Sequence, residues 1–473
     1  MDASISRQFA RWAASLRYED LPPDVVDKVK ALLLHSLTGA AIGSQTTKAK
    51  HAVHLTLEEE PKHDGATILV NGAKATRIGA TFANAETIHA SDLLDSYRML
   101  THPGPILVPA ALANAELGGK TGKDVIVALV AGYEFLFRLC DDFIPSTAAR
   151  GFRPSPIYGT MGAAMVAGKL MDLDEDRLVA AISIAAHCAS GLFSGGGLYG
   201  GGGEGSIHEP NAARQGVFAA LMARDGGIRG SEMTIEGPSG FYNAYTGNAE
   251  GNLTYAFNGP MRVDFASITK DLGSQYRLLT AMFRMYPLPG YNQPVIDLIV
   301  EMMREHRLTA AEIETLEVSM NYIETLYPSP AFPQMDPYRP AVGQAHYYAA
   351  HAAVNGGVPV VGGRTYGPTG LDLSADRAVL DFMEAHVRLV PVWGQDMFSP
   401  NILIRAKDGA LYSGSYPYAR MEWDFAQLVD RLQECLPGYP GGKPAFDRLV
   451  EATRSADEWP SMHAIYEVLA AQQ

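Results

Sequence analysis

Residues 89–105 read His-Ala-Ser-Asp-Leu-Leu-Asp-Ser-Tyr-Arg-Met-Leu-Thr-His-Pro-Gly-Pro, a polar segment between two apolar helical patterns. The preceding pattern covers 78–88 and the following one covers 106–117. Only 19% of the chain is charged, so this segment is unusually dense in titratable side chains. Such groups on a loop between rigid helices are a common setting for catalysis. We therefore place the candidate active site here; the alternative is a capped interhelical loop with solvated charges.

The length and charge of the chain restrict its architecture and its partners. With 473 residues, the chain is too long for one compact core, and we expect two or more domains. It has 38 basic and 52 acidic residues and a net charge of −14, without a Lys/Arg-rich run. We therefore expect no nucleic-acid and no membrane partner, and an anionic substrate would have to be bound by a few cations in a cleft.

Cysteine usage and the N-terminus indicate a cytoplasmic protein. The three cysteines form no Cys-x-x-Cys motif, and we expect reduced core residues at Cys140, Cys188 and Cys435. The first residues lack the pattern of a signal peptide, and no apolar run reaches the length of a transmembrane helix.

Histidine spacing gives little support for a metal site. His51 and His54 have the spacing of one helical face but no third ligand nearby in the sequence, and His346 and His351 are five residues apart. We predict no metal site and no cofactor.

The coarse pattern predicts a mostly α protein with a large all-helical domain and a smaller inserted α+β lid domain. Residues 1–265 read as successive helices; one begins at Pro22-Pro23-Asp24 and ends near Gly43. Residues 266–422 mix alternating strand patterns, such as Leu316-x-Val-x-Met320, with helices. Asp408-Gly409 lies between two strand patterns and predicts a hairpin with a type I′ turn. Residues 423–473 are helical again, and we expect them to return to the first domain.

A glycine-rich stretch covers residues 194–205. It lacks the Gly-Lys-Ser/Thr ending of a phosphate loop and follows no strand, so phosphate binding is not indicated. A mobile flap over a cleft and a merely permissive loop remain alternative interpretations.

Several stretches together resemble one family over most of the chain. They are the segment from Asn84 to Ser96 with His102-Pro-Gly, the segment Gly159-Thr-Met-Gly-Ala-Ala-Met-Val-Ala-Gly-Lys, the segment His208-Glu-Pro-Asn-Ala-Ala-Arg-Gln-Gly, and Tyr286-Pro. These resemble the MmgE/PrpD family, which includes 2-methylcitrate dehydratase, cis-aconitate decarboxylase and iminodisuccinate epimerase. The resemblance implies a helical domain with an α+β lid, a site between them, a homodimer and no cofactor.

The resemblance also implies roles for individual residues. Asp92, His102 and Tyr322 stand at catalytic positions. The substrate-binding residues implied by the matched segments are Ser96, Arg98, Arg153, His208 and Gln293.

Three positions depart from the family pattern. Arg153 and Gln293 each stand where a histidine is usual, and Gly205 stands where a lysine is usual. Arginine binds carboxylates bidentately, so Arg153 keeps an anionic substrate plausible, though a different one.

We therefore expect a cofactor-independent lyase, of the hydro-lyase or decarboxylase type, that removes a proton from a small polycarboxylate or related organic acid. Asp92 or His102 would be the base, Tyr322 an acid and Arg153 a carboxylate clamp. The alternatives are a dicarboxylate epimerase or isomerase, a non-catalytic relative that binds an organic acid or a protein partner, and a structural dimer.

Overall fold

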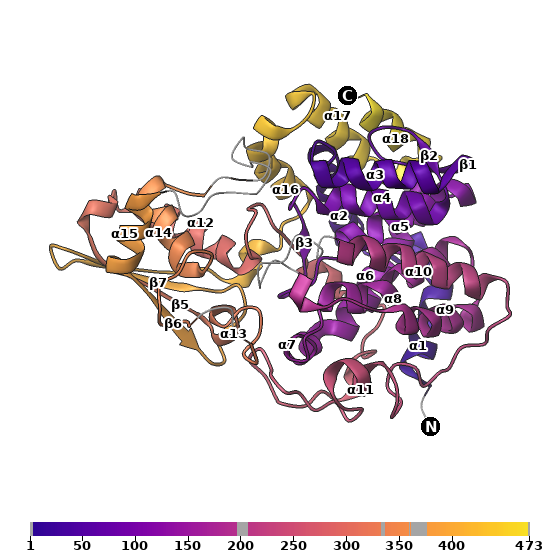
Figure 1. The fold of residues 1–473 in the computed structure, drawn as a ribbon, viewed down its shortest axis with the longest axis horizontal. Helices are drawn as coiled ribbons and strands as arrows, with labels where there is room; N and C mark the ends of the chain where they lie inside the picture. Colours follow the sequence, from indigo (N-terminus) through magenta and orange to yellow (C-terminus); the bar gives the residue numbers. More distant parts are fainter. Residues whose placement is uncertain (1–2, 196–206, 333–335, 359, 361–375, 472–473) are drawn as a thin grey trace.

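The computed structural model describes residues 3–195, 207–332, 336–358, 360 and 376–471. The glycine-rich stretch predicted to be a flap or a permissive loop lies almost entirely outside these residues, and so does Gly205. Figure 1 shows a helical body, a smaller lobe beside it, and C-terminal helices that lie against the body. The prediction of a mostly α protein with a smaller sheet-containing part is confirmed.

The helical body is built from the first half of the chain. Its longer helices are α1 (Ile5–Ser15), α2 (Pro23–Gly43), α3 (Thr47–Glu59), α4 (Arg77–His89), α5 (Gly104–Gly118), α6 (Gly122–Cys140), α8 (Pro154–Leu170), α9 (Glu175–Cys188) and α10 (His208–Arg224). The short helices α7 (Ile144–Ala149) and α11 (Phe241–Thr246) and the short strands β1 (Pro61–Thr67) and β2 (Lys74–Ala75) complete it.

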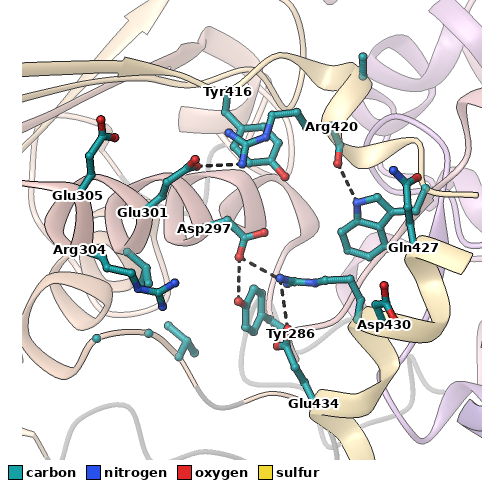
Figure 2. Close-up of a pocket in the computed structure, with 17 residues that line it drawn as sticks. Tyr286, Asp297, Glu301, Arg304, Glu305, Tyr416, Arg420, Gln427, Asp430 and Glu434 are labelled. Carbon is teal, nitrogen blue, oxygen red and sulfur yellow. Dashed lines mark hydrogen bonds and ion pairs between the residues drawn. The ribbon is translucent and has the colours of Figure 1, made fainter.

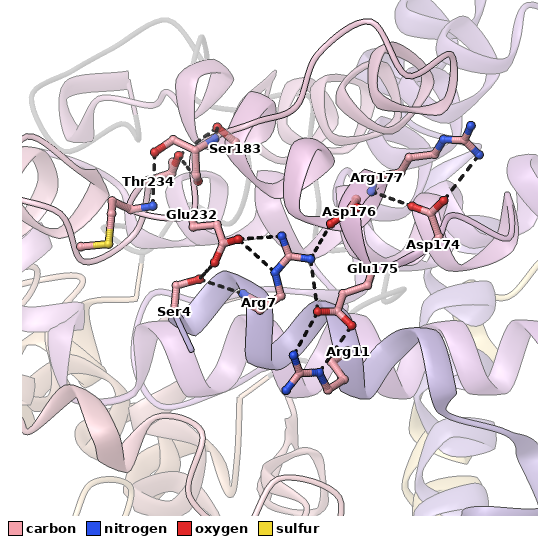
Figure 3. A network of polar contacts seen from close by, with 12 residues as sticks. Ser4, Arg7, Arg11, Asp174, Glu175, Asp176, Arg177, Ser183, Glu232 and Thr234 are labelled. Atoms are coloured by element: carbon pink, nitrogen blue, oxygen red, sulfur yellow. Dashed lines mark hydrogen bonds and ion pairs between the residues drawn. The ribbon is translucent and has the colours of Figure 1, made fainter. Parts of the chain in front are cut away.

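The N-terminal helix α1 is attached to the body by a charged network around Arg7, which Figure 3 shows. One guanidinium nitrogen of Arg7 lies 2.6 Å from Asp176 and 3.2 Å from Glu175, and the other lies 2.7 Å from Glu232. Asp176 and Glu232 are largely exposed, so solvent screens much of this attraction, and the network orients α1 more than it stabilises the fold.

Small residues allow the central helices to approach closely. A β-carbon built on Gly216 of α10 would lie 2.5 Å from the carbonyl oxygen of Thr160 and 2.4 Å from the β-carbon of Ala163, both on α8. Backbone atoms cannot move aside as a flexible side chain would, so glycine is required at this crossing. The Ala- and Gly-rich sequence of α8 therefore indicates tight helix packing, as the sequence suggested.

The lobe contains a four-stranded mixed sheet in the order β6-β5-β7-β8. Strand β5 (Ile313–Asn321) pairs in parallel with β6 (Val387–Val392) and antiparallel with β7 (Asn401–Ala406), which pairs antiparallel with β8 (Leu411–Ser415). The helices of the lobe are α12 (Gln293–Glu305), α13 (Tyr322–Thr325), α14 (Ala345–Asn355) and α15 (Arg377–His386). Along β5, the predicted alternating residues Leu316, Val318 and Met320 are all buried.

The predicted hairpin between β7 and β8 is present, but its turn differs from the predicted type I′. Gly409 donates a backbone hydrogen bond to Ala406, and Ala406 donates one to Ala410, which closes a three-residue loop. Gly409 has a φ of 91°, whereas Asp408 does not take a positive φ. Because a type I′ turn needs positive φ at both central residues, the Asp-Gly pair here closes a longer turn with glycine at its left-handed position.

The C-terminal helices α16 (Phe425–Leu432) and α17 (Gly442–Arg454) pack against α2, and α18 (His463–Ala470) packs against α17. The backbone N–H of Phe425 donates to Asp27 at 2.9 Å, and Lys30 forms an ion pair with Asp457 at 2.5 Å. Some residues after 265 also contact the body: Arg138 of α6 donates to the carbonyls of Ile268 and Lys270. The division into domains at 265 and 422 stays a prediction.

Within the part of the chain that the structure describes, no helix is both long and apolar enough to cross a membrane.

The close crossing of α8 and α10 gives a stability prediction. Gly216→Ala should lower the free energy of unfolding by about 3 kcal/mol, because the added methyl group meets backbone on two sides. Gly227→Ala is the matched control, since a β-carbon there meets nothing within 4 Å. Denaturant unfolding of both variants would measure the difference; equal stability would show that the helices can separate without cost.

Candidate active site

The loop between α4 and α5 is held by a short strand pair. Strand β3 (Asp95–Ser96) pairs antiparallel with β4 (Met282–Phe283), so Asp95 lies opposite Phe283. Asp92, Arg98 and Leu100 all take positive φ, between 48° and 67°. Non-glycine residues rarely adopt this conformation, and its cost must be offset by the contacts that hold the loop.

The carboxylate of Asp95 provides such contacts. It accepts a hydrogen bond from the backbone N–H of Gly104 at 2.7 Å and another from the hydroxyl of Tyr133 on α6 at 2.6 Å. The residue is only 1% exposed, and burial raises the pKa of its carboxyl to about 6. Asp95 thus joins the middle of the loop to the start of α5 and to the central helix α6, and its backbone carbonyl faces His102.

His102 is buried, and hydrogen bonds fix its backbone and its ring. Its backbone N–H donates to the hydroxyl of Ser155 at 3.0 Å, and its Nδ1 lies 3.1 Å from the carbonyl oxygen of Asp95 and 2.8 Å from Oγ of Ser96. A carbonyl oxygen can only accept, so we assign the proton to Nδ1, which leaves the lone pair on Nε2.

The surroundings of His102 keep its imidazole neutral. Burial lowers its pKa well below the ordinary value, and the positive charges of Arg284 and Arg153 lower it further. A neutral imidazole with an unprotonated Nε2 can accept a proton, so His102 has the state that a general base requires.

Arg284 was not predicted from the sequence and lies beside the loop because it follows β4. Its Nε and Nη2 donate to the backbone carbonyl of Asp92 at 3.1 and 2.8 Å, and Nη2 lies 3.3 Å from the Asp92 carboxylate. The side chain of Asp92 is 55% exposed, whereas that of Arg284 is 10% exposed. A largely buried cation therefore lies beneath an accessible carboxylate.

Gln293, predicted to bind substrate, instead brackets Arg284. Its Oε1 accepts from the backbone N–H of Met285 at 2.7 Å, and its Nε2 donates to the carbonyl of Phe283 at 3.1 Å. The amide is fully buried and its hydrogen-bonding atoms are used by backbone on either side of Arg284. The structure thus gives this side chain a positioning role.

A second buried ion pair lies next to the loop. Nε and Nη2 of Arg153 both bind Oε1 of Glu209 at 3.0 Å, and Nε2 of His89 lies 3.3 Å from Oε2. Glu209 is fully buried; the charges of Arg153 and the neighbouring histidines overcome burial and hold the pKa of its carboxyl far below the usual range. Glu209 was not singled out from the sequence, because an acid in the first turn of a helix usually only complements the helix dipole.

A narrow cavity of about 30 Å³ lies beside His102 and Arg284. Its polar lining comes from Ser96, Arg98, His102, Arg284, Tyr291 and Tyr327. Burial raises the pKa of the Tyr327 hydroxyl, while Arg153 and Arg284 oppose that rise, so the hydroxyl is protonated at neutral pH and can donate. Tyr327 was not predicted from the sequence.

Most of the predicted site residues lie at or near the cavity, whereas Tyr322 does not. Ser96, Arg98 and His102 line the cavity, Asp92 contacts Arg284 there, and Arg153 acts on the cavity through its charge. His208 is half-buried and precedes Glu209 at the start of α10.

Tyr322 lies elsewhere. Its hydroxyl donates to the carbonyl of Ala256 at 2.8 Å, its ring packs against Trp393, and it is absent from the lining of the cavity. We therefore give it no part in the chemistry proposed below.

A larger groove lies between α12 of the lobe and α16, and Figure 2 shows its charged lining. Its charges pair with each other: Arg431 lies 3.5 Å from Asp297, and Arg420 lies 2.8 Å from Glu301. The groove contains no histidine, and its tyrosine hydroxyl at Tyr286 already donates to Asp297. The cavity at His102 is therefore the better candidate for acid–base chemistry, although it is smaller.

Among the residues that the structure describes, no group of three or more His, Cys, Asp or Glu side chains is placed to hold a metal ion. The groups at the cavity are instead those of acid–base catalysis: a neutral imidazole, a carboxylate, a protonated phenol and arginines.

The field at His102 leads to a titration prediction. Arg284→Gln should raise the pKa of His102, because it removes a positive charge that disfavours the imidazolium. NMR titration of the histidine ring resonances would measure the change. The exposed His463, paired only with Glu467, serves as the internal control and should not shift. An unchanged titration of His102 would show that Arg284 does not act on it.

Comparison with known proteins shows which family the chain belongs to. A family model described as the MmgE/PrpD N-terminal domain matches residues 7–254. The chain is 26% identical over 317 residues to the cis-aconitate decarboxylase-like protein oryM of Aspergillus oryzae, covering 64% of this chain and 63% of that protein. It is 26% identical over 313 residues to the cis-aconitate decarboxylase of Aspergillus terreus, covering 64% and 61%. The human cis-aconitate decarboxylase is 26% identical over 246 residues, half of each chain. The matches thus span less than two thirds of these relatives. Because the family model covers more than half of the chain, the protein belongs to the MmgE/PrpD family.

Proposed function

We propose that the protein is a cofactor-independent lyase that removes a proton next to the carboxylate of a small organic acid. The observation that carries this proposal is the neutral His102 in one cavity with Arg284, whose guanidinium pairs with the carboxylate of Asp92. These groups supply a base and a cation for the charge that develops on the substrate. The decarboxylase names of the relatives support a lyase on an organic acid.

In the proposed mechanism, the substrate carboxylate binds the guanidinium of Arg284. Either Nε2 of His102 or the carboxylate of Asp92 takes the proton from the adjacent carbon. The C–H electron pair moves toward the carboxylate, and Arg284 stabilises the resulting enediolate.

For a hydro-lyase, this electron pair then forms the carbon–carbon double bond, and the β-hydroxyl leaves with the C–O pair. The proton held by the base passes to the leaving oxygen, so water is released and the base is regenerated. Tyr327 lines the same cavity and its hydroxyl can donate a hydrogen bond to the leaving oxygen.

A decarboxylase would use the same cavity differently. The bond to a carboxylate would break, carbon dioxide would leave, and a protonated group would then deliver a proton to the carbon. The names of the relatives favour this reaction, whereas the neutral state of His102 favours initial proton removal.

The homodimer implied by the family resemblance is part of the same proposal. Phe218 and Met222 lie four residues apart on one face of α10, and their exposed fractions are 39% and 43%. Apolar side chains on one exposed face are suited to contact a second copy. Light scattering of the purified protein should give twice the chain mass, and a monomer would remove this part of the proposal.

The proposed chemistry is tested by proton NMR in D₂O with a panel of mono-, di- and tricarboxylic acids. We expect exchange, loss of water or loss of carbon dioxide with at least one acid. Asp92→Asn and His102→Gln should each slow the reaction of the accepted acid, and the variant that removes the base should slow it about 100-fold or more.

Asp64→Asn, at an exposed acid far from the cavity in sequence, is the matched control and should react like the unaltered protein. Full activity of both Asp92→Asn and His102→Gln would contradict the assigned roles. If an acid binds without any reaction, the protein is a binding relative and the proposed lyase activity is wrong.

A further inference from the structure

The positive charges of Arg153 and Arg284 act on the cavity. The two arginines differ in whether an incoming carboxylate can replace their acidic partner. Nε and Nη2 of Arg153 both bind one oxygen of Glu209, and the exposed fraction of the Glu209 side chain is 0%. Glu209 begins the first turn of α10, and its other oxygen lies 3.3 Å from His89. A carboxylate buried and paired in this way cannot turn to solvent without leaving Arg153 as an unpaired buried charge.

Arg284 has a replaceable partner. The carboxylate of Asp92 lies 3.3 Å from its Nη2, and the Asp92 side chain is 55% exposed. Asp92 can rotate into water while its backbone carbonyl stays bound to Arg284. An incoming carboxylate can therefore take the place of the Asp92 side chain on Arg284.

The third arginine at the cavity, Arg98, is also paired with acidic side chains. Nε of Arg98 lies 2.6 Å from Asp141, and Asp142 lies 3.8 Å from its Nη2. Among the described residues at the cavity, each arginine thus has an acidic partner: Glu209 of Arg153 is 0% exposed, Asp141, the nearer partner of Arg98, is 14% exposed, and Asp92 of Arg284 is 55% exposed.

Building on the proposed function, we infer that the site takes an organic acid with a single carboxylate, bound by Arg284, because Glu209 permanently occupies Arg153. A second substrate carboxylate near Arg153 would meet the negative charge of Glu209. The rest of the substrate carries neutral groups, such as hydroxyl or amide, that hydrogen-bond to Tyr327 and Ser96. Glu209 is therefore the residue that determines how many carboxylates the substrate carries.

This charge arrangement also selects between the two lyase reactions. Loss of a sole carboxylate would require its negative charge to move onto carbon, whereas Arg284 stabilises that charge on the carboxylate oxygens. Elimination of water keeps the carboxylate intact and anchored from substrate to product. The substrate class is thus a β-hydroxy monocarboxylate, and the product is the α,β-unsaturated monocarboxylate plus water.

Three probes of nearly equal shape test the inference: crotonate, fumaramate and fumarate. Fumaramate and fumarate differ only in whether the second group is a neutral amide or a carboxylate. Affinity is measured by calorimetry, and hydration is followed by proton NMR. The unaltered protein should favour crotonate and fumaramate over fumarate at least tenfold. Glu209→Gln should reduce that preference at least tenfold, because Arg153 becomes available to the second carboxylate.

Two further variants keep the test decisive. Arg153→Met combined with Glu209→Gln removes both charges and should restore the preference for fumaramate, and it leaves no unpaired buried charge if the single variant does not fold. Glu134→Gln is the matched control, because Glu134 is also fully buried and binds Arg138 at 2.9 Å, outside the cavity. It should lower stability without changing the preference.

The outcomes separate this inference from the proposed function. If the protein binds or hydrates fumarate or cis-aconitate better than the monocarboxylates, the single-carboxylate inference is wrong and the lyase proposal stands. An unchanged preference in a folded Glu209→Gln variant also overturns the inference. If no acid binds or reacts, the proposed function fails as well.

Discussion

The carboxylate of Asp95 accepts hydrogen bonds from Gly104 and Tyr133, and the geometry of the cavity depends on this buried contact. It joins the middle of a loop with three left-handed residues to the start of α5 and to the central helix α6. The same residue presents its backbone carbonyl to Nδ1 of His102. Asp95 therefore contributes both to the loop conformation and to the position of the proton on His102. Without that contact, the strained backbone would relax and the imidazole would lose its orientation.

Charge balance determines what this arrangement can do. Burial and two nearby arginines keep His102 neutral, so the cavity contains a base without a negative charge of its own. The arginines in turn are paired with acids that differ in exposure; we propose that a substrate carboxylate therefore binds Arg284 and that Arg153 stays paired with Glu209. The relatives are named for cis-aconitate, which carries three carboxylates. In our account, the difference between the partners of Arg284 and Arg153 changes which substrate binds more than it changes the chemical step.

Much of the fold could be predicted because its signals are local. Pro22-Pro23 and Gly43 bracket α2, and Asp408-Gly409 marks the hairpin between β7 and β8. The polar segment around Asp92 and His102 could also be found, since its composition differs from its neighbours. Arg284 and Glu209 could not, because their importance arises from pairs with Asp92 and Arg153, which lie 192 and 56 residues away in the sequence.

The resemblance to relatives had a similar limit. It named positions but not contacts, so it could not show that Gln293 binds backbone and that Tyr322 donates to Ala256.

The central claim, that a substrate carboxylate replaces Asp92 on Arg284, is tested most directly by a crystal structure with crotonate bound. The account predicts the crotonate carboxylate on the Arg284 guanidinium, Asp92 turned toward solvent, and the Arg153–Glu209 pair unchanged. A carboxylate bound to Arg153 with Glu209 displaced, or bound outside this cavity, would contradict it.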